Sequence, residues 1–304
     1  MYSKILVPLD GSQLSEGILP YSRSLAKAFG IPLELLHVID PETIEASSSS
    51  AEGRYFFAAE AEIQKARTTY LDDVARDHLS SLTVQRFVQT GNPAGLIVDH
   101  ARAHPDTLVA MATHGRSGVQ RWFMGSVAEK VLHACSNPLL LVRTAGKGKI
   151  SDDVVLKTLI VPLDGSPLAE LALPHAAALA KALKLQVILV RVYFVPTEGY
   201  VGEGYVPDIE PLLDTLKTEA KEYIEDKVRS LKAQGVEKIS YELPEGSAAG
   251  RIIDLSRETP DNLVAMSTHG RSGIGRWVLG NVTDRVVRHC GDPVLVIRAP
   301  RPGA

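Results

Sequence analysis

The strongest constraint on the fold is that the chain repeats itself once, end to end. The segment Ile5–Ser12 returns at Leu159–Ser166, an offset of 154 residues, and Thr113–Gly118 returns at Thr268–Gly273, an offset of 155. A shared short peptide can arise by chance, but a nearly constant offset over a whole half indicates a duplicated domain. We therefore expect one domain over residues 1–146, a second over 154–304, and a linker over 147–153, which is small, charged and glycine-containing.

Each half alternates short apolar runs with helical patterns. In the first half we expect strands at 5–9, 33–38, 84–88, 107–111 and 139–142, and helices at 12–29, 56–82, 93–103 and 126–134. The second half repeats this order. Strands that alternate with helices indicate an α/β fold with a doubly wound parallel sheet, here a five-stranded, flavodoxin- or Rossmann-like domain in each half. In such sheets, ligands bind beyond the carboxyl ends of the strands.

Composition narrows the class of protein. The chain has 304 residues, of which 45% are hydrophobic, which is enough to fill two cores. Its net charge of −3, with scattered Lys and Arg, argues against a nucleic-acid partner. The two cysteines are too few for a disulfide scaffold. Without a signal-peptide pattern or an apolar run of membrane-spanning length, we expect no membrane partner and a cytoplasmic location.

Two segments follow strand ends on the side where a ligand would bind. They are Pro8–Ser12 and Ala112–Ser126. A glycine loop that enters a helix presents unpaired N–H groups and the positive end of the helix dipole, which suits a phosphate group. The sequence contains neither G-x-x-x-x-G-K-[ST] nor a G-x-G-x-x-G motif after the first strand, so a P-loop and a dinucleotide fingerprint are both excluded.

These residues resemble the universal stress protein family over essentially the whole chain, as two such domains in tandem. The resemblance rests on Ile5–Ser12, His37-Val38, Gly91-Asn92-Pro93, Met111–Ser126 and Pro138–Arg143, with their partners in the second half. ATP-binding members carry the pattern G-x2-G-x9-G-[ST]. Gly115 and Gly125-Ser126 match its last two parts in the first half, and Gly270 and Gly280-Asn281 take the same positions in the second.

The resemblance implies that the protein binds ATP, with or without Mg²⁺, through the glycine loop and the helix N-terminus, and that it has a stress-response or regulatory role. Asp10 and Asp164 match the acidic residue near the base and ribose, and Val38 and Val192 match the residue whose backbone meets the adenine. The remaining positions match the phosphate cradle: Ala112, Gly115, Arg116, Ser117, Gly118, Gly125, Ser126 and Val127 in the first half, and Gly270, Arg271, Ser272, Gly273, Gly280, Asn281 and Val282 in the second.

Both halves depart from the family pattern. The first glycine of the pattern is Ala112 in one half and Ser267 in the other, and the hydroxyl position is Ser126 in one half but Asn281 in the other. We therefore expect the first half to be the better nucleotide site.

Several alternatives stay open at this stage. Ser126 with Glu129, and Asn281 with Asp284, could be helix N-caps with an acidic third residue. The whole chain could be an interaction module that keeps the fold without the ligand, or a weak ATPase, although no catalytic residues stand out. Its protein partners are unknown, and no metal site is expected from the His–Cys pairs near Cys135 and Cys290. The resemblance also implies that the last strands pair within one chain as a pseudo-dimer, or between chains as a homodimer.

Overall fold

The computed structural model describes residues 1–41, 53–115, 124–145, 154–194, 210–268 and 279–298. The chain divides into two compact units, and the division falls between Val155 and Leu156. The expected linker, 147–153, lies outside the described residues. The serine-rich segment after the second strand and its counterpart at 195–209 also lie outside them.

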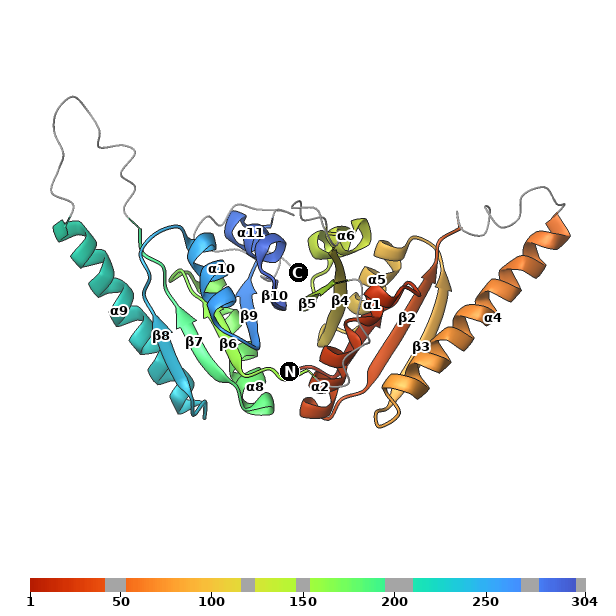
Figure 1. The fold of residues 1–304 in the computed structure, drawn as a ribbon, viewed down its shortest axis with the longest axis horizontal. Helices are drawn as coiled ribbons and strands as arrows, with labels where there is room; N and C mark the ends of the chain where they lie inside the picture. Colours follow the sequence, from red (N-terminus) through yellow and green to blue (C-terminus); the bar gives the residue numbers. More distant parts are fainter. Residues whose placement is uncertain (42–52, 116–123, 146–153, 195–209, 269–278, 299–304) are drawn as a thin grey trace, which may run out of the picture. The chain divides into compact units, whose positions relative to one another are not determined.

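Unit 1 contains five strands and the helices between them (Figure 1). In chain order its described elements are β1 (Lys4–Pro8), α1 (Gln13–Glu16), α2 (Leu19–Phe29), β2 (Leu33–Ile39), α4 (Gly53–His78), β3 (Val84–Thr90), α5 (Pro93–Arg102), β4 (Thr107–Gly115), α6 (Ser126–Ala134) and β5 (Leu139–Ala145).

Unit 2 follows the same order, which is the structural form of the sequence repeat. Its described elements are β6 (Thr158–Pro162), α7 (Pro167–Glu170), α8 (Ala172–Leu183), β7 (Gln186–Val190), α9 (Glu210–Ala233), β8 (Ile239–Glu242), α10 (Ala248–Glu258), β9 (Asn262–Ser267), α11 (Asn281–His289) and β10 (Val294–Ile297).

All strand pairs within each unit are parallel. In unit 1 the spatial order is β3-β2-β1-β4-β5, and in unit 2 it is β8-β7-β6-β9-β10. The order therefore reverses between β1 and β4 and again between β6 and β9. This confirms the expected doubly wound, Rossmann-like fold and places a ligand-binding crevice at these two reversals.

Helices cover both faces of each sheet. Right-handed crossovers put α2 and α4 on one face of the unit 1 sheet and α5 and α6 on the other, where α5 and α6 contact each other. The strands are correspondingly apolar on both faces: in β1, Ile5, Leu6 and Val7 are completely buried, and in β6 the same is true of Leu159, Ile160 and Val161.

The first helix of each unit differs from the expectation. The sequence predicts one helix over 12–29, but the structure has two, α1 and α2, which meet at Gly17 and Ile18. A Cβ at Gly17 would collide with the side chain of Thr144 on β5. Unit 2 breaks at the same place, between α7 and α8, with Leu171 at the position of Gly17. The two units share a proline early in the second helix, Pro20 in α2 and Pro174 in α8, which cannot donate the backbone hydrogen bond that would continue the first helix. The helix ends as expected, with Gly30 in the left-handed conformation at φ +64°.

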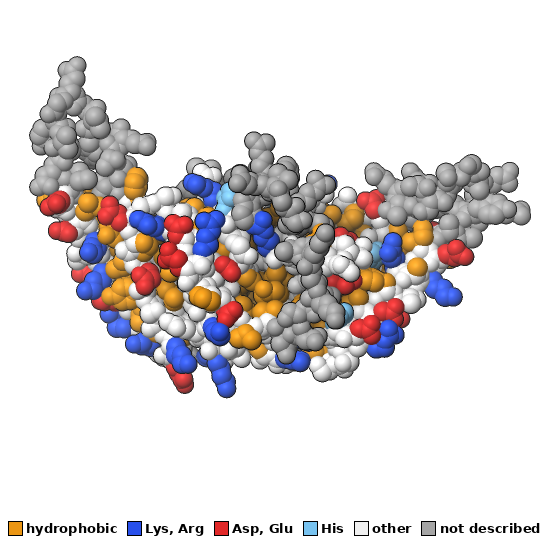
Figure 2. All heavy atoms as spheres, viewed as in Figure 1, with side chains coloured by type: hydrophobic (Ala, Val, Ile, Leu, Met, Phe, Trp, Pro, Cys, Tyr) orange, Lys and Arg blue, Asp and Glu red, His pale blue; other side chains and the backbone are white. Residues whose placement is uncertain are grey.

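Charged side chains are mixed on the surface. In the view of Figure 2, Lys and Arg alternate with Asp and Glu around the described part of unit 2, and no broad patch of one sign is visible there. Within the described residues, no helix combines the length and apolarity needed to cross a membrane.

Candidate functional site

Each unit has a pocket at the point where its strand order reverses. The unit 1 pocket has a volume of about 370 Å³, and its walls come from the ends of β1, β2 and β4 and from α5 and the first turn of α6. It is lined by Pro8, Leu9, Asp10, Ser15, Leu36, Val38, Pro93, Ile97, Met111, Ala112, Gly125, Ser126, Val127 and Ala128.

The unit 2 pocket occupies the equivalent place, with a volume of about 300 Å³. It is lined by Pro162, Leu163, Asp164, Ala169, Val190, Val192, Ala248, Ile252, Met266, Ser267, Gly280, Asn281, Val282 and Thr283. Most positions are the repeat partners of those in unit 1, so the duplication has preserved the crevice as well as the core.

The structure brings most of the predicted site residues together. Eleven of them line the two pockets: Asp10, Val38, Ala112, Gly125, Ser126 and Val127 in unit 1, and Asp164, Val192, Gly280, Asn281 and Val282 in unit 2. Gly115 is the last residue of β4. Its counterpart Gly270 lies outside the described residues, as do Arg116, Ser117 and Gly118 and their counterparts Arg271, Ser272 and Gly273.

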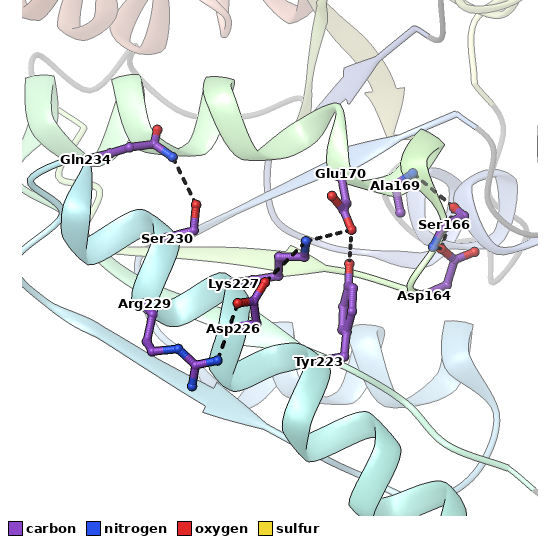
Figure 3. Close-up of polar contacts among 10 residues, drawn as sticks. All are labelled: Asp164, Ser166, Ala169, Glu170, Tyr223, Asp226, Lys227, Arg229, Ser230 and Gln234. Atoms are coloured by element: carbon purple, nitrogen blue, oxygen red, sulfur yellow. Dashed lines mark hydrogen bonds and ion pairs between the residues drawn. The ribbon is translucent and has the colours of Figure 1, made fainter.

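A tight turn holds the aspartate at one wall of each pocket. Oδ1 of Asp10 accepts a hydrogen bond of 2.8 Å from the backbone N–H of Ser12. Oδ1 of Asp164 accepts one of 2.9 Å from the N–H of Ser166 and another of 2.6 Å from its hydroxyl, as Figure 3 shows. The turn passes through Gly11 at φ +87° and Gly165 at φ +85°, a conformation that favours glycine.

The N-terminus of a helix without a side-chain cap also lines each pocket. Gly125 is the N-cap of α6 and Gly280 is the N-cap of α11, and neither helix has a side-chain cap hydrogen bond. The expected capping roles of Ser126 with Glu129, and of Asn281 with Asp284, are therefore wrong: Ser126 and Asn281 are the first helical residues, one position too late to cap. Because glycine has no side chain, the first-turn amides at the pocket have no side-chain acceptor at the N-cap position.

A tyrosine–glutamate pair ties the long helix of each unit to the aspartate turn. The hydroxyl of Tyr70 on α4 donates a hydrogen bond of 2.9 Å to Glu16, and that of Tyr223 on α9 donates one of 3.0 Å to Glu170. Lys227 also reaches Glu170, at 3.1 Å (Figure 3). Burial, and then the neighbouring carboxylate, raises the pKa of both tyrosines, so each stays a hydrogen-bond donor at neutral pH.

Each unit also places an arginine against the glycine of this turn, but from a different element. In unit 1, a Cβ at Gly11 would lie 3.4 Å from Nη1 of Arg67, on α4. In unit 2, a Cβ at Gly165 would lie 2.5 Å from Nη1 of Arg191, which follows β7. From the strand register, Arg191 of unit 2 occupies the position equivalent to His37 of unit 1. The position equivalent to Arg67 is occupied by Ala220. Both units thus have an arginine side chain next to the glycine of the aspartate turn, but the arginine belongs to a different element in each unit.

Sequence reasoning missed these supporting residues. The missed positions are Glu16, Arg67 and Tyr70 in unit 1 and Glu170, Arg191 and Tyr223 in unit 2. The signal was available for two pairs, because Glu16 recurs as Glu170 and Tyr70 as Tyr223 at offsets of 154 and 153. It was not available for the arginines, because they occupy different positions in the two halves.

The cysteines are buried within hydrogen-bond networks. Asn137, near Cys135, donates to the carbonyl oxygens of His104, Pro105 and Thr107. Cys290 lies 3.1 Å from the hydroxyl of Ser256, which donates to Asp292 at 2.7 Å. Burial is the largest cause of the raised pKa of the Cys290 thiol. The described residues contain no group of three or more His, Cys, Asp or Glu side chains that could hold a metal ion.

Comparisons with known proteins agree with one another. The model of the Universal stress protein family matches residues 1–143 and again 156–298. A universal stress protein of Mycolicibacterium smegmatis is 24% identical over 303 residues, which cover 97% of this chain and 96% of the relative. One from Methanocaldococcus jannaschii is 31% identical over 145 residues, covering 48% of this chain and 84% of the relative.

A solved structure shows the same fold over the full length. The crystal structure of a universal stress protein from Archaeoglobus fulgidus superposes with a TM-score of 0.69 at 19% identity, covering 98% of this chain and 99% of that one. The chain therefore contains one duplicated domain, because the sequence repeat, the repeated pocket and the two family matches all fall in the same two halves.

Proposed function

Because the chain belongs to the universal stress protein family, as a tandem of two such domains, we propose that it binds ATP in the unit 1 pocket and acts as a cytoplasmic stress-response or regulatory protein. Binding of the nucleotide changes the conformation at the pocket, and this change alters the binding of a partner protein. The unit 2 pocket binds nucleotide more weakly, since Asn281 replaces the hydroxyl of Ser126.

One observation carries this proposal: the first turn of α6, which has no side-chain cap, and the carboxylate residue Asp10 line the same pocket. Free amides and the positive end of the helix dipole favour an anion. A carboxylate fixed by a turn accepts hydrogen bonds from hydroxyl groups, such as those of a ribose. The pocket is also lined by the apolar residues Leu36, Ile97 and Met111, which suit the faces of a base.

The residues present therefore fit ATP. Asp10 would accept from the ribose, the backbone at Val38 would meet the adenine, and the amides of Ser126 and Val127 would hold phosphate oxygens, with the Ser126 hydroxyl as a further donor. Glycine at 125 leaves room for the phosphate to approach the backbone. A bound Mg²⁺ would neutralise part of the phosphate charge.

Calorimetric titration with Mg²⁺–ATP tests the proposal. Wild type should bind; Asp10→Ala and Ser126→Ala should each weaken the tighter site by about fivefold to a hundredfold, as expected for loss of a hydrogen bond to a charged or hydroxyl group. Asp164→Ala should leave that site unchanged, and the surface variant Glu62→Ala serves as a control. Absence of binding to wild type at millimolar ATP contradicts the proposal.

A second function is favoured by the residues that replace the family's pattern. Ala112 and Ser267 both add a Cβ where the family has glycine, which fits an interaction module that has lost the nucleotide. Nucleotide that co-purifies with the chain would rule this out. Slow ATP hydrolysis is a lesser proposal: turnover that survives Asp10→Ala would come from a contaminant.

The family resemblance extends to assembly. We propose that the last strands, β5 and β10, pair within the chain as a pseudo-dimer, as single-domain members do between chains. Light scattering tests whether two chains associate further: a mass near 33 kDa indicates a monomer, and twice that mass indicates a homodimer.

A further inference from the structure

The two pockets differ in polarity at matched positions. The unit 1 pocket has Ala112 on β4 and Ala128 on α6, whereas the unit 2 pocket has Ser267 on β9 and Thr283 on α11. Conversely, the buried Ser15 of unit 1 corresponds to Ala169 in unit 2. The second pocket therefore is not only a reduced copy of the first, because it has gained hydroxyl groups on a wall that is apolar in unit 1.

Ser267 is the residue among these whose hydroxyl is left without a partner. Ser267 is among the residues that line the unit 2 pocket and is 5% exposed, and its Oγ, shielded from solvent in the unliganded chain, has no hydrogen-bond partner among the described residues. By contrast, Thr283 uses its hydroxyl to donate to the carbonyl oxygen of Ser267 at 2.8 Å. Buried hydroxyl groups in folded proteins are nearly always hydrogen-bonded, so this one indicates a partner that the described residues do not provide.

The position of Ser267 beside a helix N-terminus favours a negatively charged partner for its hydroxyl. Two hydrogen bonds join the end of β9 to the start of α11: Thr283 Oγ1 to Ser267 O, and the N–H of Gly280 to Thr268 O, both 2.8 Å. Ser267 therefore lies beside the first turn of α11, a nine-residue helix without a side-chain cap. The positive end of that helix favours an anionic oxygen over a neutral one at this wall.

We propose that the hydroxyl of Ser267 donates a hydrogen bond to a phosphate oxygen of the ligand, so that the unit 2 pocket selects nucleoside phosphates over nucleosides. This rests on the proposed function, that the pockets take nucleotides. The unit 1 pocket lacks the same donor because it has Ala112. Ser267 is thus a specificity-determining residue of the second pocket.

Methionine methyl NMR can separate the two pockets in the intact chain. Of the four methionines, Met111 lines the first pocket and Met266 lines the second. Titration of the labelled protein with AMP, and separately with adenosine, gives an affinity for each pocket. Ser267→Ala should weaken AMP at Met266 about tenfold while changing adenosine there less than twofold, and AMP at Met111 should be unaffected. The exposed Ser240→Ala in β8 is the matched control and should change neither ligand.

Stability of the unliganded protein gives a second readout. Because the hydroxyl has no internal partner, Ser267→Ala should leave the urea midpoint of unit 2 unchanged or raise it. A lower midpoint would show that the hydroxyl is bonded inside the protein and would overturn the inference, as would equal weakening of AMP and adenosine. If nucleotide shifts Met111 but not Met266 in wild type, this inference fails while ATP binding by unit 1 stands; if it shifts neither, both fail.

Discussion

The guanidinium of Arg191 packs against Gly165, so closely that a Cβ at that glycine would lie 2.5 Å from Nη1 and 3.1 Å from Cζ. The same guanidinium lies 5.1 Å from the centre of the Tyr223 ring, which reaches Glu170 through its hydroxyl. The turn that holds Asp164 is therefore supported by the guanidinium of Arg191, which contacts the ring of Tyr223. Since Tyr223 belongs to α9, this long helix contributes to the shape of the pocket wall.

Gly165→Ala should destabilise unit 2 by about 2–3 kcal/mol, because the new methyl group strains a positive φ and also displaces Arg191. Gly11→Ala should cost unit 1 only about 1 kcal/mol, since its Cβ would lie 3.4 Å from Arg67 and only the backbone is strained. Urea unfolding followed at the methyl groups of Met266 and Met111 reports on the two units separately.

Gly250→Ala is the matched control for these substitutions. Gly250 lies within α10, and its added Cβ would have ordinary contacts at 3.8 Å and beyond. Since alanine favours helix over glycine, this variant should be neutral or stabilising by up to about 1 kcal/mol. A cost at Gly11 equal to that at Gly165 would contradict the role assigned to Arg191.

The serines at the starts of the helices should separate structural caps from ligand contacts. The hydroxyl of Ser166 accepts a hydrogen bond of 3.1 Å from the N–H of Ala169, so Ser166→Ala should cost about 1 kcal/mol. Ser126 makes no cap bond in α6, and Ser126→Ala should cost less than about 0.5 kcal/mol while lowering ATP affinity. Equal losses of stability would indicate that Ser126 caps its helix after all.

Unit 1 contains a buried charged group that unit 2 replaces with less polar residues. Glu34, 6% exposed, accepts from Lys4 at 2.8 Å and contacts His100 at 2.9 Å. Burial alone would raise the pKa of Glu34, but the bonds to Lys4 and His100 lower it below its usual value. The matching positions in unit 2 are Thr158, Ile188 and Leu255.

Glu34→Gln should therefore destabilise unit 1 by about 3 kcal/mol, because it leaves a nearly buried lysine without its counter-charge. The triple variant Lys4→Thr, Glu34→Ile, His100→Leu, which copies unit 2, should recover to within about 1 kcal/mol of wild type. Urea midpoints at Met111 measure both. If the triple variant is no more stable than Glu34→Gln, then the group of Lys4, Glu34 and His100 itself stabilises this region. The loss in Glu34→Gln would then not come from a lysine left without its counter-charge.

Stability of unit 1 should fall as the pH is lowered from about 7 to 5.5. Burial, and then the charge of Arg67, lowers the pKa of His37 below its usual 6.5, so the folded unit keeps the ring neutral while the unfolded chain takes up a proton. The contribution of His37 is thus fully present above the unfolded pKa and is lost below it. His37→Gln should flatten the fall in melting temperature measured at Met111.

The control for this pH effect is His175→Gln. Burial lowers the pKa of His175 as well, so this variant should flatten the pH dependence at Met266 and leave that at Met111 unchanged. A fall in unit 1 stability that is as steep in His37→Gln as in wild type would assign the effect to other groups.

The sequence predicted the duplication, the order of elements and the parallel sheets because these depend on local, periodic information. Apolar strands such as Ile5–Leu9, glycines such as Gly30 and the constant offset between halves can each be recognised without knowing what packs against them. The predicted positions of Asp10 and Gly125 follow from the same information, since both come after a strand, on the side of a parallel sheet where ligands bind. The spatial order of the strands was not predicted.

What only the tertiary structure decided was contact between distant segments. The close approach of Thr144 to Gly17 joins residues more than a hundred positions apart, and the exchange of Arg67 for Arg191 is visible only once each reaches the aspartate turn of its own unit. The N-cap of α6 fell on Gly125 rather than Ser126, because backbone geometry at the strand-to-helix turn, and not residue preference, sets where the helix begins. Likewise, the missing partner of the Ser267 hydroxyl depends on what surrounds it in space. The two repeated sequences thus specified one fold twice, and the residues that differ between the repeats made the two pockets different, while packing decided what each of those residues contacts.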